Sequence, residues 1–284
     1  MAFPEINRGL QFFKYPSETD KSYKYVDRTV SAGIKAKYAK PWDWVNDQKA
    51  DLFIFELGGD DLIRNIQGGG GGISNLFGIY VSLSAEFGLM KSLAKKSKGV
   101  ILNVPDMISL PYFTQITNEK INKLGVKLFA QISSGSEQYR PFDPTADRLI
   151  PSNTVEKLFN GELKGNVNLK DVDVVSKQSS DDEFFDISPG SYNQNEIALI
   201  AKEMNWLVVD MNNLYKRIQT GSYVTDDGVA VNAAWPKGGN FFSADGVYPT
   251  AFGQAVIANE VIKTLNRHYG LDIPLLQTRF FVGK

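Results

Sequence analysis

Short apolar runs are the clearest pattern along the chain, and they predict buried strands. Three of them, at residues 52–57, 100–104 and 206–209, lack the alternation of a half-exposed strand. Continuous apolar runs of this length are typical of parallel strands whose two faces are both covered by helices. A weaker run at residues 126–130 predicts a fourth strand. The pattern therefore predicts an α/β protein with a mainly parallel sheet.

Helical patterns connect these runs. Residues 73–96 are compatible with a helix, and residues 193–204 carry a capping-box pattern followed by the helix-like stretch IALIAKEM. The last helix has the strongest signals, because apolar side chains recur on one face of residues 251–269. Thr250 is a suitable N-cap, and Gly270 stands where a helix commonly ends in the left-handed conformation.

The segments between these elements differ in character. Residues 132–192 are polar and predict an insertion or a cap over the sheet, and residues 68–72 are five consecutive glycines, which favour a mobile linker. No internal repeat and no second hydrophobic core are evident. The sequence therefore predicts one domain spanning residues 1–284.

Composition excludes several classes of function. The 284 residues include 31 basic and 32 acidic side chains, so the net charge of −1 gives no basis for nucleic-acid binding. The absence of cysteine excludes disulfides, thiol nucleophiles and cysteine-ligated metals, and the single histidine, His268, excludes a multi-histidine metal site. We expect no metal, no cofactor and no membrane span, since no apolar run approaches the roughly 20 residues that a span requires.

Three loops are candidates for chemistry, because ligands of open α/β sheets bind beyond the carboxyl ends of the strands. They are residues 58–61 (GGDD) after the first strand, Pro105 and Asp106 after the second, and residues 243–250 before the last helix. Each also has a plain interpretation as a turn in which an aspartate caps the following backbone.

Taken in order, these segments resemble the SGNH/GDSL-type hydrolases. The stretch LFIFELGGDDLI resembles the third conserved block of that family, Gly-x-Asn-Asp, and residues 241–274 resemble the fifth block, Asp-x-x-His-Pro, in the form found in GDSL-like lipoproteins of Bacteroidetes. The resemblance implies a flavodoxin-like three-layer α/β/α sandwich and an ancestry in acyl-ester hydrolysis. It also implies an extracytoplasmic location, although the chain shows no signal peptide and no lipobox cysteine.

The residues that the resemblance assigns to catalysis depart from the family. No Gly-Asp-Ser segment supplies the nucleophile. Gly59, Asp60 and Asp61 correspond to the oxyanion and substrate region, where Asp60 replaces an asparagine and so removes a donor worth roughly 2.7–4 kcal/mol. Tyr248 stands at the position of the catalytic histidine, whereas Asp245, which would orient that histidine, is retained. A phenol with a pKa near 10 is a poor general base at neutral pH.

His268 cannot replace the lost base, because about 18 helical residues place it roughly 27 Å from Asp245. Three interpretations stay open. The chain is a hydrolase-like protein with impaired catalysis that keeps a pocket for an acyl- or sugar-ester-like ligand, or an active or truncated GDSL-type esterase, or a hydrolase that uses Asp60 and Asp245 as its acid and base. The sequence leaves the oligomeric state undecided.

Overall fold

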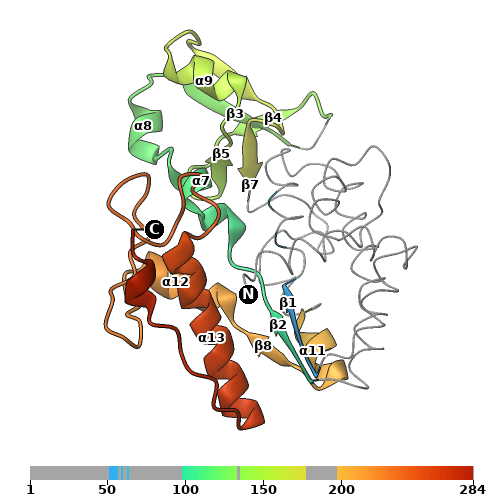
Figure 1. Cartoon of the computed structure of the whole chain (residues 1–284). Helices are drawn as coiled ribbons and strands as arrows, with labels where there is room; N and C mark the ends of the chain where they lie inside the picture. Colours follow the sequence, from blue (N-terminus) through green and yellow to red (C-terminus); the bar gives the residue numbers. More distant parts are fainter. Residues whose placement is uncertain are drawn as a thin grey trace, which may run out of the picture.

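The main sheet consists of three parallel strands in the order β1-β2-β8 (Figure 1). A computed structural model describes residues 51–56, 59, 63, 98–132, 135–176 and 197–283, and the following account concerns these residues. The strands are β1 (Leu52–Glu56), β2 (Lys98–Leu102) and β8 (Leu207–Val209). Each overlaps a predicted run, although β2 begins and ends before the run at 100–104 does. The prediction of a mixed α/β protein with a parallel sheet is confirmed.

β2 is the central strand of the main sheet. Val100 and Ile101 are 0% exposed, and β1 and β8 pair with its two edges. Because both faces of β2 are covered, apolar residues occupy successive positions rather than alternate ones. Near the N-terminal end of β2, Gly99 lies against the ring of Trp206, which fills the space that a Cβ would need. That ring stacks on Phe55 with 5.4 Å between the ring centroids.

The last helix, α13 (Ala251–Tyr269), matches its prediction at both ends. The Thr250 hydroxyl accepts a hydrogen bond from the backbone N–H three residues later, and Gly270 follows the helix at φ 62°. The hydroxyl of Tyr269 accepts a hydrogen bond from the N–H of Gly99 (3.3 Å) and donates one to its carbonyl (3.0 Å). The end of α13 is therefore fixed to the start of β2.

Two shorter helices flank β8 in the sequence. α11 (Ala198–Met204) precedes it and lies within the predicted helix at 193–204, and α12 (Met211–Gln219) follows it. The predicted capping box, the predicted helix at 73–96 and the glycine run at 68–72 lie outside the described residues. No helix in the described part of the chain is long and apolar enough to cross a membrane.

A second group of elements, here called the upper lobe, lies beyond the carboxyl ends of β1 and β2 (Figure 1). The fourth predicted strand is present as β3, but it pairs with β4 and β6 rather than with the main sheet. β5 and β7 form a separate antiparallel pair. The chain reaches this lobe through η2 (Met107–Ser109) and α7 (Pro111–Thr114), and the lobe comprises α8 (Asn118–Asn122), β3 (Lys127–Gln131), β4 (Tyr139–Pro141), β5 (Asp147–Leu149), α9 (Asn153–Phe159), β6 (Asn166–Leu169) and β7 (Val174–Ser176).

The upper lobe has a hydrophobic cluster of its own, which the polar composition of residues 132–192 conceals. Leu149, Leu158 and Leu169 are each at most 1% exposed and belong to a cluster separate from the one around the main sheet. This second cluster is not evident in the sequence. Three- and four-residue strands bury at most two side chains each, so no long apolar run marks them.

A bidentate ion pair joins the two small sheets of the upper lobe. Arg140 on β4 donates from both terminal nitrogens to the carboxylate of Asp147 on β5, at 2.7 Å each, and also reaches Ser176 on β7 at 3.1 Å. The Asp147 side chain is 0% exposed. The hydrogen bonds to Asp147 raise the pKa of the Arg140 guanidinium, so this guanidinium stays charged.

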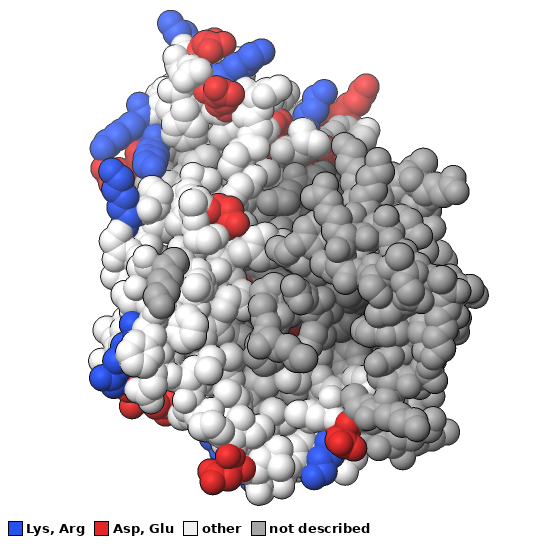
Figure 2. Space-filling view, in the orientation of Figure 1, with Lys and Arg blue, Asp and Glu red and all other residues white. Residues whose placement is uncertain are grey.

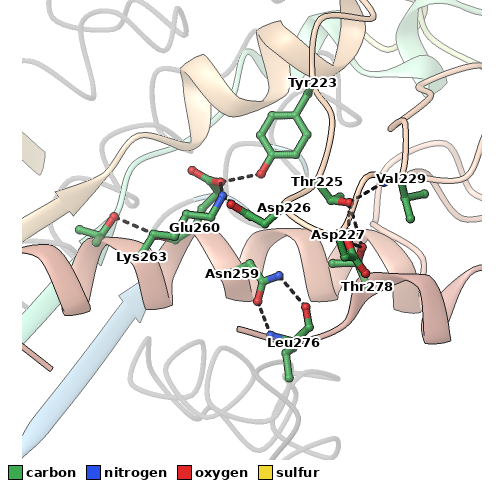
Figure 3. Close-up of polar contacts among 11 residues, drawn as sticks. Tyr223, Thr225, Asp226, Asp227, Val229, Asn259, Glu260, Lys263, Leu276 and Thr278 are labelled. Atoms are coloured by element: carbon green, nitrogen blue, oxygen red, sulfur yellow. Dashed lines mark hydrogen bonds and ion pairs between the residues drawn. The ribbon is translucent and has the colours of Figure 1, made fainter. Parts of the chain in front are cut away.

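The segment after α13 runs back along that helix and is held by side chains (Figure 3). Asn259 on α13 donates to the carbonyl of Leu276 (3.0 Å) and accepts from its N–H (2.8 Å). Further on, the carboxylate of Asp227 accepts hydrogen bonds from the Thr278 hydroxyl (2.6 Å) and the Arg279 N–H (3.0 Å) at η5 (Thr278–Phe281). Residues 271–281 are thus an integral part of the fold.

Replacing Gly99 with alanine tests the contact between β2 and the Trp206 ring. A Cβ at this position overlaps the ring, so we expect Gly99→Ala to lower the free energy of unfolding by about 1–3 kcal/mol or more. Gly59→Ala is the control, because a Cβ there meets the nearest atom at an ordinary 3.5 Å. Urea denaturation measures both. Equal stability of the two variants contradicts the tight packing described for Gly99.

The carboxylate of Asp227 makes stability sensitive to acid. Burial raises the pKa of this carboxyl, but hydrogen bonds from Thr225, Thr278 and Arg279 outweigh the burial and hold the pKa well below its usual 3.8. A depressed pKa in the folded state means that the stabilisation is complete above about pH 5 and is lost as the pH falls below the usual value. The free-energy difference between wild type and Asp227→Asn should therefore shrink between pH 6 and pH 3, as denaturation at each pH measures. Asp272→Asn, at an exposed position, should follow the wild type, and a constant difference for Asp227→Asn contradicts the assignment.

Candidate functional site

The structure brings together the loops that the sequence singled out. A Cβ at Gly59, after β1, would lie 3.5 Å from the Met107 Cε atom, in the segment that follows β2. Farther along that segment, the Tyr112 N–H donates a hydrogen bond to the carbonyl of Gly246 (3.0 Å), in the loop before α13. The loops after β1 and before α13 therefore both approach residues 107–112, which continue the loop after β2 at the carboxyl edge of the main sheet. We call five described residues of these segments the edge site: Gly59, Asp106, Tyr112, Asp245 and Tyr248. Asp60 and Asp61 lie outside the described residues.

Close backbone approach fixes the loop before α13. Gly246 has φ 69°, and a Cβ there would come within 3.0 Å of both the Trp235 ring and the Tyr112 nitrogen. The Trp235 indole N–H donates to the carbonyl of Ser243 in the same loop (3.0 Å). Burial raises the pKa of the Tyr112 phenol, so this side chain is uncharged at neutral pH. Only glycine fits at position 246, because both the backbone angle and the space exclude a side chain.

Asp245 shapes the turn that presents Tyr248. Its Oδ1 atom accepts hydrogen bonds from the Ser243 hydroxyl (2.7 Å), the Val247 N–H (2.8 Å) and the Tyr248 N–H (2.9 Å). This is the capping arrangement that the plain interpretation of the loop predicts. Tyr248 is 48% exposed. The geometry gives Asp245 a structural role, and the catalytic roles of Asp245 and Tyr248 stay predictions.

Sequence reasoning missed two polar residues at the same edge of the sheet. Asn103, 9% exposed, follows β2, and its side-chain amide donates to the carboxylate of Asp210 after β8 (3.0 Å). The Asn103 Oδ1 atom accepts from the N–H of Asn212 in the first turn of α12 (3.0 Å). Asn103 and Asp210 each come directly after apolar strand residues. This position in the sequence is the signal that could have identified them as residues of the carboxyl edge.

The remaining expectations concern His268 and metals. His268 lies in the last turn of α13, at the end of the helix away from Thr250, as predicted. Among the described residues, no three histidine, aspartate or glutamate side chains gather as a metal ion would require. On the face drawn in Figure 2, basic and acidic side chains are interspersed over the described surface.

Comparisons with known proteins leave the family undetermined. A scan against protein-family models finds no match, and searches of the curated proteins and of the solved structures find no significant similarity. Arguments about function therefore depend on the geometry of this chain.

Substitutions of Asp245 separate its turn-forming role from a need for charge. Asp245→Ala removes an acceptor of three hydrogen bonds and should lower the free energy of unfolding by about 1–2 kcal/mol. Asp245→Asn keeps an oxygen acceptor and should stay within about 0.5 kcal/mol of wild type, since asparagine forms the same turns. Thermal denaturation of both variants measures the effect. A loss in Asp245→Asn as large as in Asp245→Ala shows instead that the charge is essential.

Proposed function

We propose that the chain is an SGNH/GDSL hydrolase-like protein with a flavodoxin-like three-layer sandwich and impaired catalysis. Its edge site binds an acyl- or sugar-ester-like ligand without efficient turnover. The observation that carries the proposal is the meeting of the three family-like loops at the carboxyl edge of a parallel sheet, with Asp245 forming a turn. This is the part of an open α/β sheet where ligands bind.

The topology supports the fold. In the flavodoxin-like strand order 2-1-3-4-5, strands 3, 4 and 5 are neighbours in the sheet and also follow one another along the chain. β1, β2 and β8 form such a series, and α13 follows the last of them. In this alignment β1 is the strand before the third block of the resemblance. The carboxyl ends of all three strands then belong to the edge where the family keeps its site.

The chemistry of the edge site supports binding rather than hydrolysis. Hydrolysis of the family type needs an activated serine, and the chain has no Gly-Asp-Ser segment. Tyr248 stands where the base would be, and a phenol stays protonated at neutral pH. The Asp245 oxygen that would orient a histidine already accepts three hydrogen bonds within its own turn. What the loops retain is a shaped, partly aromatic surface at Tyr112 and Tyr248.

The upper lobe supports a role in ligand recognition. It lies beyond the carboxyl ends of the strands, and α7 connects it to the loop after β2 (Figure 1). The Tyr112 N–H on α7 also holds the loop that presents Tyr248. A ligand bound against the edge site would therefore lie at the edge of the main sheet that faces the lobe.

Intact-mass spectrometry after treatment with a fluorophosphonate, beside p-nitrophenyl acetate hydrolysis, tests the loss of catalysis. We expect neither an adduct nor turnover. A stoichiometric adduct with turnover establishes the active-esterase alternative instead. Turnover without an adduct that Asp245→Asn abolishes establishes the alternative in which carboxylates act as acid and base.

Thermal denaturation with acetylated oligosaccharides and short acyl esters tests binding. A ligand at ten times its Kd stabilises by about 1.4 kcal/mol, which corresponds to a rise in Tm of roughly 2–4 °C. Tyr248→Ser should reduce this rise, whereas Phe280→Ser, at an aromatic residue 64% exposed and outside the edge site, should leave it unchanged. No rise with any member of the panel contradicts the proposal.

A further inference from the structure

A cavity of about 400 Å³ lies on the flank of β8, between α12 and α13. It is distinct from the edge site, because Gly59, Asp106, Tyr112, Asp245 and Tyr248 do not line it. Its floor comes from β8 and its walls from the two helices. Leu207, Val208 and Val209 form the floor.

The two walls are each one face of a helix. On the α12 side the lining positions are 210, 213, 214 and 217, and on α13 they are 260, 263, 264, 267 and 268. Spacings of three and four residues place side chains on the same helix face. Along α13 the cavity extends from residue 260 to residue 268, eight steps that span about 12 Å at 1.5 Å per residue. A ligand of that length would contact both walls and the strand between them.

The acidic side chains of the cavity already have partners. The Asp210 carboxylate accepts from the Asn103 amide (3.0 Å) and caps α12 through the N–H of Asn213 (3.1 Å). Glu260 accepts from the hydroxyl of Tyr223 (2.5 Å) and pairs with Lys263 (2.8 Å), as Figure 3 shows. Both carboxylates therefore have hydrogen-bond partners within the protein, and Glu260 is also paired with a cation.

Lys263 is compensated as well. Its ammonium group lies 2.6 Å from Asp226 and 2.8 Å from Glu260 (Figure 3). Burial lowers the pKa of this amine, but the hydrogen bonds to Asp226 and Glu260 outweigh the burial and raise it, so Lys263 stays charged. The ammonium group of Lys263 is therefore already paired with carboxylates of the protein.

The two arginines of the cavity are different. Within the described part of the chain, no carboxylate pairs with the guanidinium of Arg217 or of Arg267. Arg217 lies over the ring of Tyr223, 4.8 Å from its centroid, which restricts its position. Arg267 is adjacent to His268 at the other end of the α13 wall. Among the described residues, Arg217 and Arg267 are thus the strong cations of the cavity without a carboxylate partner, and guanidinium groups are well suited to anions.

The floor adds neutral hydrogen-bonding groups. The carbonyl of Val209 accepts from the N–H of Asn103, on the β2 side. Successive residues of a strand present their backbone groups to opposite edges, so the N–H and the carbonyl of Val208 face away from β2. Within the described part of the chain, no residue bonds to these two groups, and Val208 lines the cavity.

We propose that this cavity binds a small organic anion that carries a phosphate or carboxylate group. Arg217 and Arg267 hold the anionic group or groups, since the planar guanidinium matches both oxyanions with two hydrogen bonds. The backbone of Val208 hydrogen-bonds the uncharged polar part of the ligand, and Leu214 contacts its apolar surface. A site of this volume is the size of a sugar phosphate or a similar compound.

Isothermal titration of the full chain with glucose 6-phosphate, glucuronate and glucose tests the proposal. The three probes share a sugar ring and differ in carrying a phosphate, a carboxylate or no charge. We expect at least one anionic sugar to bind at millimolar concentration or below, with affinity falling as salt is added, and glucose to bind more weakly by about tenfold or more. The anionic sugar that binds identifies which oxyanion the cavity prefers.

Arginine variants locate the site. Arg267→Gln, at a side chain with no described contact to lose, should weaken binding of the anionic sugar about tenfold or more. Arg217→Gln should act in the same direction, and Lys216→Gln, on the same helix but outside the cavity, should leave the affinity unchanged. Failure of both anionic sugars to bind, or equal binding by wild type and both arginine variants, overturns the proposal. The result is independent of the edge site, because neither arginine lies there and no esterase activity is measured.

Discussion

The burial of β2 from Gly99 to Leu102 is the constraint on which the main sheet depends. A stretch of strand that is covered on both faces and paired on both edges has little contact with water, so its backbone groups must be satisfied by its neighbours. The parallel pairing with β1 and β8 meets this requirement. The same burial explains why glycine stands at the start of the strand, where the Trp206 ring and the Tyr269 hydroxyl both approach. One strand thus sets the positions of a core aromatic and of the end of the longest described helix.

Elements with local signals could be predicted from the sequence. The strands of the main sheet are continuous apolar runs, and α13 carries its own cap at Thr250, its own stop at Gly270 and an apolar face between them. The upper lobe could not be predicted as a separately clustered unit. Its buried leucines are contributed by short strands and a seven-residue helix, and each segment by itself looks like a polar loop. Its ion pair between Arg140 and Asp147 joins residues whose proximity follows only from the tertiary arrangement.

Part of the candidate site could likewise be predicted from the sequence, and part of it could not. Topology predicts that loops after neighbouring parallel strands meet, and the approach of Gly59 to Met107 agrees with that expectation. The loop before α13, which comes after α12 rather than after a strand, joins them through the hydrogen bond between Tyr112 and Gly246. The sequence also predicts the turn-capping role of Asp245, and the hydrogen bonds of its Oδ1 atom have this form. Asn103 and Asp210 each follow a strand, but the sequence does not show that these two strands are neighbours. The cavity beside β8 could not be predicted, because it depends on which faces of α12 and α13 line it.

The contacts of the segment after α13 limit where the chain can be shortened. Asn259 supplies both a donor and an acceptor to the backbone of Leu276, and Asp227 binds both the side chain of Thr278 and the backbone of Arg279. Removing residues 276–279 would leave the 2% exposed amide of Asn259 without these two partners, and the 5% exposed carboxylate of Asp227 with Thr225 as its remaining side-chain partner. Affinity tags and fusion partners should therefore be attached after residue 281, so that all the contacts of residues 271–281 are kept.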